Sequence, residues 1–260
     1  MPTVTSADGT PIAYDVVGSG PAVVLVDGAM CHRSGAPMLP LSHLLKPHFT
    51  VYSYDRRGRG GSGDTAPYAV AREVEDLAAI VTAAGGCAHA FGMSSGGALI
   101  LAGTAAGVPL TRLALYEPPF LTAVDPDAGQ RKKEFGERLR DLLDAGRAGD
   151  AVALFMTYVG VPAAMVEGMR GQPFWPAFEA IGPTLAYDDA VLGDGRVPAD
   201  AARVTVPTLV LGGGASPEAL QAAARAAADA VPGATHRTLP DQTHDVAVDA
   251  LAPVLTEFFS

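Results

Sequence analysis

Cysteine is scarce in this chain of 260 residues, which contains only Cys31 and Cys87. Two cysteines cannot build a disulfide framework, and their spacing does not match the Cys-x-x-Cys pairs of zinc or redox sites. The segment from Met1 to Gly9 also lacks the basic patch and the apolar run of a signal peptide. We therefore expect a protein of a reducing compartment and interpret the chain as cytoplasmic.

Basic residues are few as well, since 18 Lys and Arg stand against 28 Asp and Glu and give a net charge of -10. This sign opposes docking on nucleic acid or on an anionic membrane, so we expect neither partner. Residues 78–111 contain no Asp, Glu, Lys or Arg and are long enough to span a bilayer. Glycines and serines interrupt them, and this pattern predicts buried helices and a strand instead.

Apolar residues are abundant, at 48% against 18% charged residues, as is typical of a compact globule. Five short runs rich in apolar and β-branched residues end in turn residues, as strands covered on both faces do. Apolar residues at helical spacing alternate with these runs, which predicts parallel strands joined by right-handed crossovers. The predicted strands are 22–26, 49–54, 88–91, 113–116 and 207–211, and the predicted helices are 39–45, 71–84, 97–106, 217–230 and 246–259.

The stretch 121–203 breaks this alternation, because it contains helical patterns and no convincing apolar strand. The helical patterns cover 130–145, 150–159, 163–169 and 174–185. We predict one sheet core, formed by residues 1–120 and 204–260, that is interrupted by an inserted helical lid at 121–203.

The run Gly92-Met93-Ser94-Ser95-Gly96 matches the pattern Gly-x-Ser-x-Gly between a predicted strand and a predicted helix. A nucleophilic serine on such a sharp turn needs small residues two positions before and after it, because neighbouring backbones approach closely. Gly and Ser also populate ordinary turns, but the strand and the helix on either side favour a nucleophile at Ser94.

A serine nucleophile needs a base, and the chain offers six histidines. His244 lies near the carboxyl end, after an apolar segment and at the expected start of the last helix. The other five are typical of strands, helix ends or the surface. His244 is therefore the predicted base.

Together these features resemble the α/β-hydrolase superfamily over essentially the whole chain. The run 54–62, Tyr-Asp-Arg-Arg-Gly-Arg-Gly-Gly-Ser, is similar to the superfamily's Asp-x-x-Gly-x-Gly-x-Ser turn, and we interpret its arginines as structural or surface charges. Asp27 stands where a histidine more often precedes the glycine of the oxyanion turn. The resemblance implies an α/β-hydrolase fold, with a mostly parallel central sheet flanked by helices. It also implies an oxyanion hole formed by the Ser95 amide and by the amide of Gly28 or Ala29.

The acid of a catalytic triad has two candidates. Most superfamily members place Asp after the penultimate strand, but residues 211–218 contain no Asp, and Glu218 already lies in the first turn of a helix. Glu117 follows the strand that comes after the helix next to Ser94, whose sharp turn is the nucleophile elbow, and Pro118 keeps the chain extended there. In this position Glu117 resembles the acid of certain haloalkane dehalogenases and of zearalenone-type lactonases. We predict Glu117 as the acid, with Glu218 as the alternative.

The predicted lid supplies candidates for substrate binding. Phe155, Met156, Tyr158 and Trp175 have the apolar character of a pocket wall, although such residues at helical spacing are also typical of a core. Their side chains favour a fairly apolar ligand.

The leading hypothesis is a serine hydrolase that needs no metal and no other cofactor and cleaves an ester or lactone of a fairly apolar small molecule. Ser94 attacks, His244 transfers protons and Glu117 orients His244. Serine in place of aspartate at the elbow argues against dehalogenase and epoxide-hydrolase chemistry, whereas perhydrolysis and C–C bond hydrolysis stay open. The alternative from another class is a receptor-like protein that binds a ligand with slow or no turnover. Both a monomer and a homodimer are compatible with the sequence.

Overall fold

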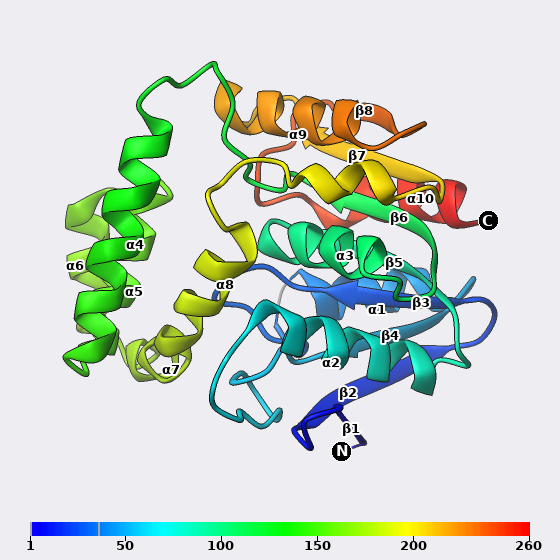
Figure 1. Cartoon of the computed structure of the whole chain (residues 1–260), viewed down its shortest axis with the longest axis horizontal. Helices are drawn as coiled ribbons and strands as arrows, with labels where there is room; N and C mark the ends of the chain where they lie inside the picture. The colour runs from blue at the N-terminus through cyan, green and yellow to red at the C-terminus, as the bar shows by residue number, and fades with distance from the viewer. Residues whose placement is uncertain (1, 36) are drawn as a thin grey trace.

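The computed structural model describes residues 2–35 and 37–260, which form one sheet with helices on both faces (Figure 1). The strand order is β1-β2-β4-β3-β5-β6-β7-β8. The strands from β4 through β3, β5, β6 and β7 to β8 are parallel, whereas β1 and β2 pair antiparallel. The predicted mostly parallel sheet is thus confirmed. The strands are β1 (Thr3–Thr5), β2 (Pro11–Gly18), β3 (Ala22–Val26), β4 (Thr50–Tyr54), β5 (Ala88–Met93), β6 (Leu110–Tyr116), β7 (Thr208–Gly213) and β8 (Thr235–Leu239).

Two hydrophobic cores lie on opposite faces of the sheet. Val24 and Val26 pack in one core with α2 (Val70–Ala83), α3 (Ser95–Ala105) and α9 (Glu218–Ala230). Val23 and Leu25 pack in the other core with α1 (Met38–Leu45) and α10 (Val248–Phe259), behind the sheet in Figure 1. Because successive side chains of a strand point to opposite faces, a strand covered on both sides is apolar at every position.

The structure also contains strands that the sequence pattern did not indicate. β1, β2 and β8 carry many exposed or half-buried residues, and β8 is the edge strand Thr-His-Arg-Thr-Leu. An edge strand covers little apolar surface, so it lacks the hydrophobic run on which the prediction relied. The last helix begins at Val248, and His244 lies in the loop before it, which corrects the expected helix start.

The uncharged segment 78–111 forms the end of α2, then β5 and α3, and the start of β6, as predicted. No helix within residues 2–35 and 37–260 has both the length and the apolar character needed to cross a membrane.

A group of helices is inserted between β6 and β7 and lies to the left of the sheet in Figure 1. Its buried residues, among them Phe135, Val152 and Leu185, form a third hydrophobic cluster. The single helix predicted at 174–185 is instead broken at Pro183. The last part of the insertion packs on the sheet core through Ala201, so the boundary at residue 203 stays a prediction. The elements are α4 (Ala128–Asp144), α5 (Ala148–Tyr158), α6 (Ala163–Arg170), α7 (Trp175–Ile181), η1 (Gly182–Thr184), α8 (Leu185–Leu192) and η2 (Ala199–Arg203).

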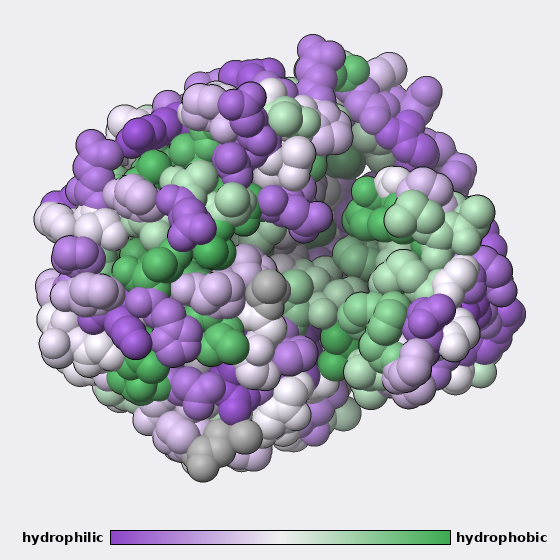
Figure 2. Space-filling view, turned by 180° about the vertical axis from the view of Figure 1, so that it is seen from behind, coloured by the Kyte–Doolittle hydropathy of each residue, from purple (hydrophilic) through white to green (hydrophobic). Residues whose placement is uncertain are grey.

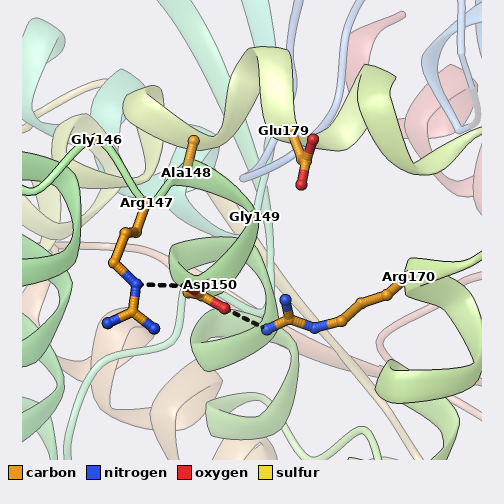
Figure 3. Close-up of a pocket in the computed structure, with 7 residues that line it drawn as sticks. All are labelled: Gly146, Arg147, Ala148, Gly149, Asp150, Arg170 and Glu179. Carbon is orange, nitrogen blue, oxygen red and sulfur yellow. Dashed lines mark hydrogen bonds and ion pairs between the residues drawn. The ribbon is translucent and has the colours of Figure 1, made fainter.

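A small charged hollow joins three of these helices (Figure 3). Asp150 on α5 accepts hydrogen bonds from Arg147 Nε and from Arg170 Nη2 on α6, each at 2.7 Å. Glu179 on α7 approaches Gly149 so closely that a Cβ there would lie 2.1 Å from Glu179 Oε1. Asp150 thus joins α5 to α6 through its two arginine partners, whereas Glu179 accepts from Trp175 Nε1 at 2.9 Å within α7.

Arg57 connects the start of the chain to α2. Its side chain is fully buried, and Nε and Nη2 donate to the two carboxylate oxygens of Asp76 at 2.8 and 2.7 Å. Nη1 donates to Asp8 at 2.9 Å. The predicted structural role is confirmed for this arginine, and none of its atoms serves as a surface charge.

We predict that Arg57→Ala lowers the free energy of unfolding by about 3–5 kcal/mol, because it leaves the buried Asp76 carboxylate without its cation. Urea unfolding measures the change. Arg72→Ala is the matched control, since Arg72 pairs with Glu75 at a partly exposed site and such pairs contribute less than about 1 kcal/mol. Equal losses in the two variants would contradict the prediction.

Candidate active site

Ser94 occupies a strained turn between β5 and α3. Its backbone has φ 55° and ψ −127°, a conformation that few residues other than glycine adopt. A Cβ on Gly92 would lie 2.5 Å from the Gly96 carbonyl oxygen, and a Cβ on Gly96 would lie 2.3 Å from the Val26 carbonyl oxygen. Only hydrogen atoms fit at both positions, which is the physical reason for the Gly-x-Ser-x-Gly pattern.

The turn after β3 lies directly against Ser94. A Cβ on Gly28 would come within 3.0 Å of Ser94 Cβ. Within residues 2–35 and 37–260, the N–H groups of Gly28 and Ala29 donate to no backbone carbonyl. Ser95 is the first residue of α3, where the amides have no partner inside the helix and the helix dipole favours negative charge. The three predicted oxyanion residues therefore lie beside Ser94 at the carboxyl edge of the sheet.

Glu117 and His244 are hydrogen-bonded to each other. His244 Nδ1 lies 2.8 Å from Glu117 Oε2, and the Gly213 amide donates to Oε1 at 2.7 Å. Glu117 is 0% exposed and has a φ of 43°. Burial alone raises the pKa of this carboxyl, but His244, the nearby Ser216 hydroxyl and the Gly213 amide outweigh burial and hold the pKa below its usual value. Glu117 is therefore a buried carboxylate that stays ionised.

Gly213, at the end of β7, leaves room for the backbone of the loop that carries His244. A Cβ on Gly213 would lie 2.3 Å from the Gln242 carbonyl oxygen. Glu218 is exposed at the first turn of α9. The geometry thus pairs His244 with Glu117 and places Glu218 on the surface.

The sequence did not single out Tyr116, which holds the loop of His244 in place. Its side chain is 0% exposed, and its hydroxyl donates to the Thr243 carbonyl. The Tyr116 carbonyl in turn accepts from the Ser94 amide at 2.9 Å. One residue of β6 therefore contacts both the elbow and the histidine loop, and its place directly before Glu117 was the available signal.

Ser94, Glu117 and His244 follow the parallel strands β5, β6 and β8. Parallel strands have their carboxyl ends at the same edge of the sheet. The elbow and the Gly28 turn also follow β5 and β3, between which the chain reverses its direction of winding. Ligands of open α/β sheets bind at such a switch point.

Asp27 presents an unusual buried acid beside this point. It is 3% exposed, and neither carboxyl oxygen has a hydrogen-bond partner within residues 2–35 and 37–260. Burial raises the pKa of Asp27 to about 8, and the positive charges of Arg59 and Arg56 only partly oppose this. The carboxyl is therefore mostly protonated at neutral pH.

The residues predicted to bind substrate lie in the hydrophobic cluster of the insertion or at its surface. Met156 and Trp175 are buried in the cluster, and Phe155 is partly buried against it. Tyr158 is 40% exposed and stacks on Phe135, with ring centroids 4.2 Å apart. Packing inside the insertion accounts for Met156 and Trp175, so contact of these four residues with a substrate stays a prediction.

The insertion nevertheless reaches the turn after β3. Ala29 and Met30 pack against its hydrophobic cluster. Figure 2 shows a deep hollow between the sheet core and the insertion, with apolar side chains gathered on the insertion side.

A sequence model described as "Alpha/beta hydrolase family" matches residues 23–256. The chain belongs to this family. An alpha/beta hydrolase from Sphaerobacter thermophilus, known from its crystal structure, has 53% sequence identity to this chain. The match covers 100% of both chains, with a TM-score of 0.88. A hydrolase from Pseudomonas aeruginosa is 26% identical over 99% of this chain and 97% of that chain, with a TM-score of 0.76. The predicted superfamily and fold are confirmed.

Another relative is the pimeloyl-(acyl-carrier protein) methyl ester esterase of Xanthomonas campestris, which is 36% identical over 131 residues. The match covers 48% of this chain and 49% of that protein, so the chain spans about half the length of the curated relatives it matches. An enol-lactonase from Burkholderia xenovorans shares the fold, with 24% identity over 99% of each chain and a TM-score of 0.68. The likeness to the enol-lactonase is one of fold.

We predict that Asp27 makes the free energy of unfolding fall as the pH rises from about 4 to about 8, because the folded state retains a proton on this carboxyl that the unfolded chain releases. The contribution of Asp27 has a slope of up to about 1.4 kcal/mol per pH unit. Asp27→Asn removes this slope and makes the protein more stable than wild type above pH 8. Urea unfolding at several pH values measures both effects.

Asp200→Asn is the control, since Asp200 is exposed on η2 and its replacement leaves the pH dependence as in wild type. Parallel curves for wild type and Asp27→Asn would show that Asp27 is not the group responsible.

Proposed function

We propose that this protein is a serine hydrolase that cleaves a carboxylic ester or lactone of a fairly apolar small molecule through an acyl-enzyme on Ser94. The observation that carries the proposal is the 2.8 Å contact between His244 Nδ1 and Glu117 Oε2 at the same sheet edge as the strained Ser94. A carboxylate at Nδ1 fixes the tautomer in which Nε2 is free to accept a proton.

In the first half of the proposed reaction, the Ser94 hydroxyl oxygen bonds to the carbonyl carbon and its proton passes to His244 Nε2. The imidazolium is stabilised by Glu117. The tetrahedral intermediate collapses when the bond to the leaving oxygen breaks and His244 gives its proton to that oxygen. A water then attacks the acyl carbon while His244 takes its proton. The bond from that carbon to Ser94 Oγ breaks, His244 returns the proton to Oγ and the acid product leaves. Side chains, backbone amides and water supply every step.

The oxyanion of the tetrahedral intermediate accepts hydrogen bonds from the Ser95 amide and, in our proposal, from Ala29 rather than Gly28. The Gly28 carbonyl, which shares a peptide with the Ala29 N–H, accepts from Arg59 Nη1 at 2.6 Å. The Asp27 carbonyl, which shares a peptide with the Gly28 N–H, has only a 3.4 Å contact with Arg56. The Ala29 amide is therefore the more firmly oriented donor.

The substrate class rests on two supports. The hollow of Figure 2 has an apolar wall on the insertion side. Relatives in sequence or fold are named for ester and lactone hydrolysis. We propose residues 121–203 as the lid over this hollow, with Phe155, Met156, Tyr158 and Trp175 shaping it, and residues 1–120 and 204–260 as the core that carries the chemistry.

We predict that Ser94→Ala lowers kcat at least about 1,000-fold and that Glu117→Gln lowers it by about 100- to 10,000-fold, since Gln cannot stabilise the imidazolium. The assay is hydrolysis of p-nitrophenyl esters with short and medium acyl chains and of small and macrocyclic lactones. Thermal unfolding of each variant verifies that it is folded.

Glu218→Gln is the matched control, because this exposed acid makes no contact with His244 and its loss leaves kcat within about twofold. Full activity in Ser94→Ala would refute the acyl-enzyme. If Glu218→Gln lost activity and Glu117→Gln retained it, Glu218 would be the acid that pairs with His244 and Glu117 would not. Absence of turnover together with tight binding of a lactone would favour the receptor-like alternative.

A further inference from the structure

We infer that Asp188, on α8 of the insertion, is a positioning residue for the oxyanion hole, because its buried carboxylate holds both the arginine that orients the Ala29 amide and the side chain of Ser95, whose own amide is the other proposed donor. The inference rests on the proposed serine hydrolase function. It gives the insertion a role beyond covering the substrate.

Asp188 is 4% exposed, and its carboxylate is bound from three directions. Oδ1 accepts from the Ser95 hydroxyl at 2.6 Å and from Arg56 Nη1 at 2.7 Å. Oδ2 accepts from Arg59 Nη2 at 2.6 Å. Burial raises the pKa of Asp188, but the two arginines and the Ser95 hydroxyl outweigh burial and hold the pKa below its usual value. The residue therefore acts as a fixed negative charge.

One branch of this network leads to the turn after β3. Arg59, held by Asp188, donates through Nη1 to the Gly28 carbonyl at 2.6 Å. In a trans peptide the carbonyl and the following N–H point in opposite directions, so a bond to the Gly28 oxygen fixes the direction of the Ala29 N–H. A charged donor on the carbonyl also polarises the peptide and strengthens its N–H as a donor.

The second branch leads to the elbow. Ser95 is 1% exposed, and its hydroxyl lies between Asp188 Oδ1 and Arg56 Nη1, at 2.6 and 3.1 Å. The same residue carries the other oxyanion amide. Asp188 thus fixes the side chain of one donor residue directly and the peptide of the other through Arg59.

Charge balance explains why a carboxylate is needed here. Glu73 on α2 binds Arg56 through both oxygens, at 2.6 and 2.8 Å. The other hydrogen bonds of Arg59 go to the Thr184 hydroxyl at 3.0 Å and to the Gly28 carbonyl, so Asp188 is its anionic partner within residues 2–35 and 37–260. Without the negative charge of Asp188, no ion pair holds the buried Arg59 guanidinium against the Gly28 carbonyl.

Asp188→Asn keeps the shape of the side chain but turns an amide donor toward an arginine donor. We expect kcat to fall 10- to 100-fold with KM within about threefold, since removal of a whole oxyanion donor costs about 100- to 1,000-fold and displacement costs less. A trifluoromethyl ketone substrate analogue, which forms an oxyanion on Ser94, should lose affinity in proportion to kcat/KM. Affinity for the carboxylic acid product should change less than threefold.

Asp189→Asn is the matched control on the same helix. Asp189 pairs with Lys132 of α4, inside the insertion, and contacts neither arginine of the network. Removing the pair of Asp189 with Lys132 loosens the insertion without touching the network of Asp188. We expect kcat of this variant to stay within about twofold of wild type. If Asp188→Asn does not fold, Ser95→Ala takes its place, because it removes one hydroxyl and keeps the amide; kcat is expected to fall about 10-fold.

The positioning role is overturned if folded Asp188→Asn has the kcat of wild type. It is also overturned if Asp189→Asn loses as much kcat as Asp188→Asn. A fall in product affinity equal to the fall in ketone affinity overturns this role too, because it reflects general loosening. Ser94→Ala in the same assay separates the two claims: if it is inactive while Asp188→Asn is not impaired, only this inference fails. If wild type turns over no substrate, both fail.

Discussion

Three backbone segments meet around Ser94 at separations that leave space for hydrogen atoms alone. The strand end at Gly92, the helix start at Gly96 and the carbonyl of Val26 at the end of β3 all crowd the elbow. This close approach depends on β3 and β5 being neighbours and on α3 lying across both. The strained conformation of Ser94 persists because the surrounding packing leaves it no relaxed alternative.

Two buried acids at this edge of the sheet have opposite proton states. Glu117 receives a hydrogen bond from the Gly213 amide and pairs with His244, and these contacts favour the ionised form. Asp27 is buried to a similar degree without a hydrogen-bond partner within residues 2–35 and 37–260, and burial favours its neutral form. Burial alone does not decide the charge of a carboxyl; the available donors do.

The inserted helices are joined to the chemistry of the core by charge as well as by apolar contact. Arg56 and Arg59 belong to the core, while Asp188 belongs to the insertion, and all three are buried. Separating α8 from the core would leave charges without partners in a low-dielectric setting, which is costly. This constraint keeps α8 seated on the core, whereas the hydrophobic cluster of α4 to α7 depends on contacts among those helices.

The sequence by itself determined the parallel strands, the elbow serine and the late histidine, because each depends on local patterns: continuous apolar runs, small residues around a sharp turn, and chain order. It also favoured Glu117, since a charge directly after an apolar strand needs a partner. The edge strands β1 and β8 and the network of Asp188 were decided by tertiary structure alone. Ser95 and Asp188 are separated by 93 residues in the chain, and no local pattern records a contact made across that distance.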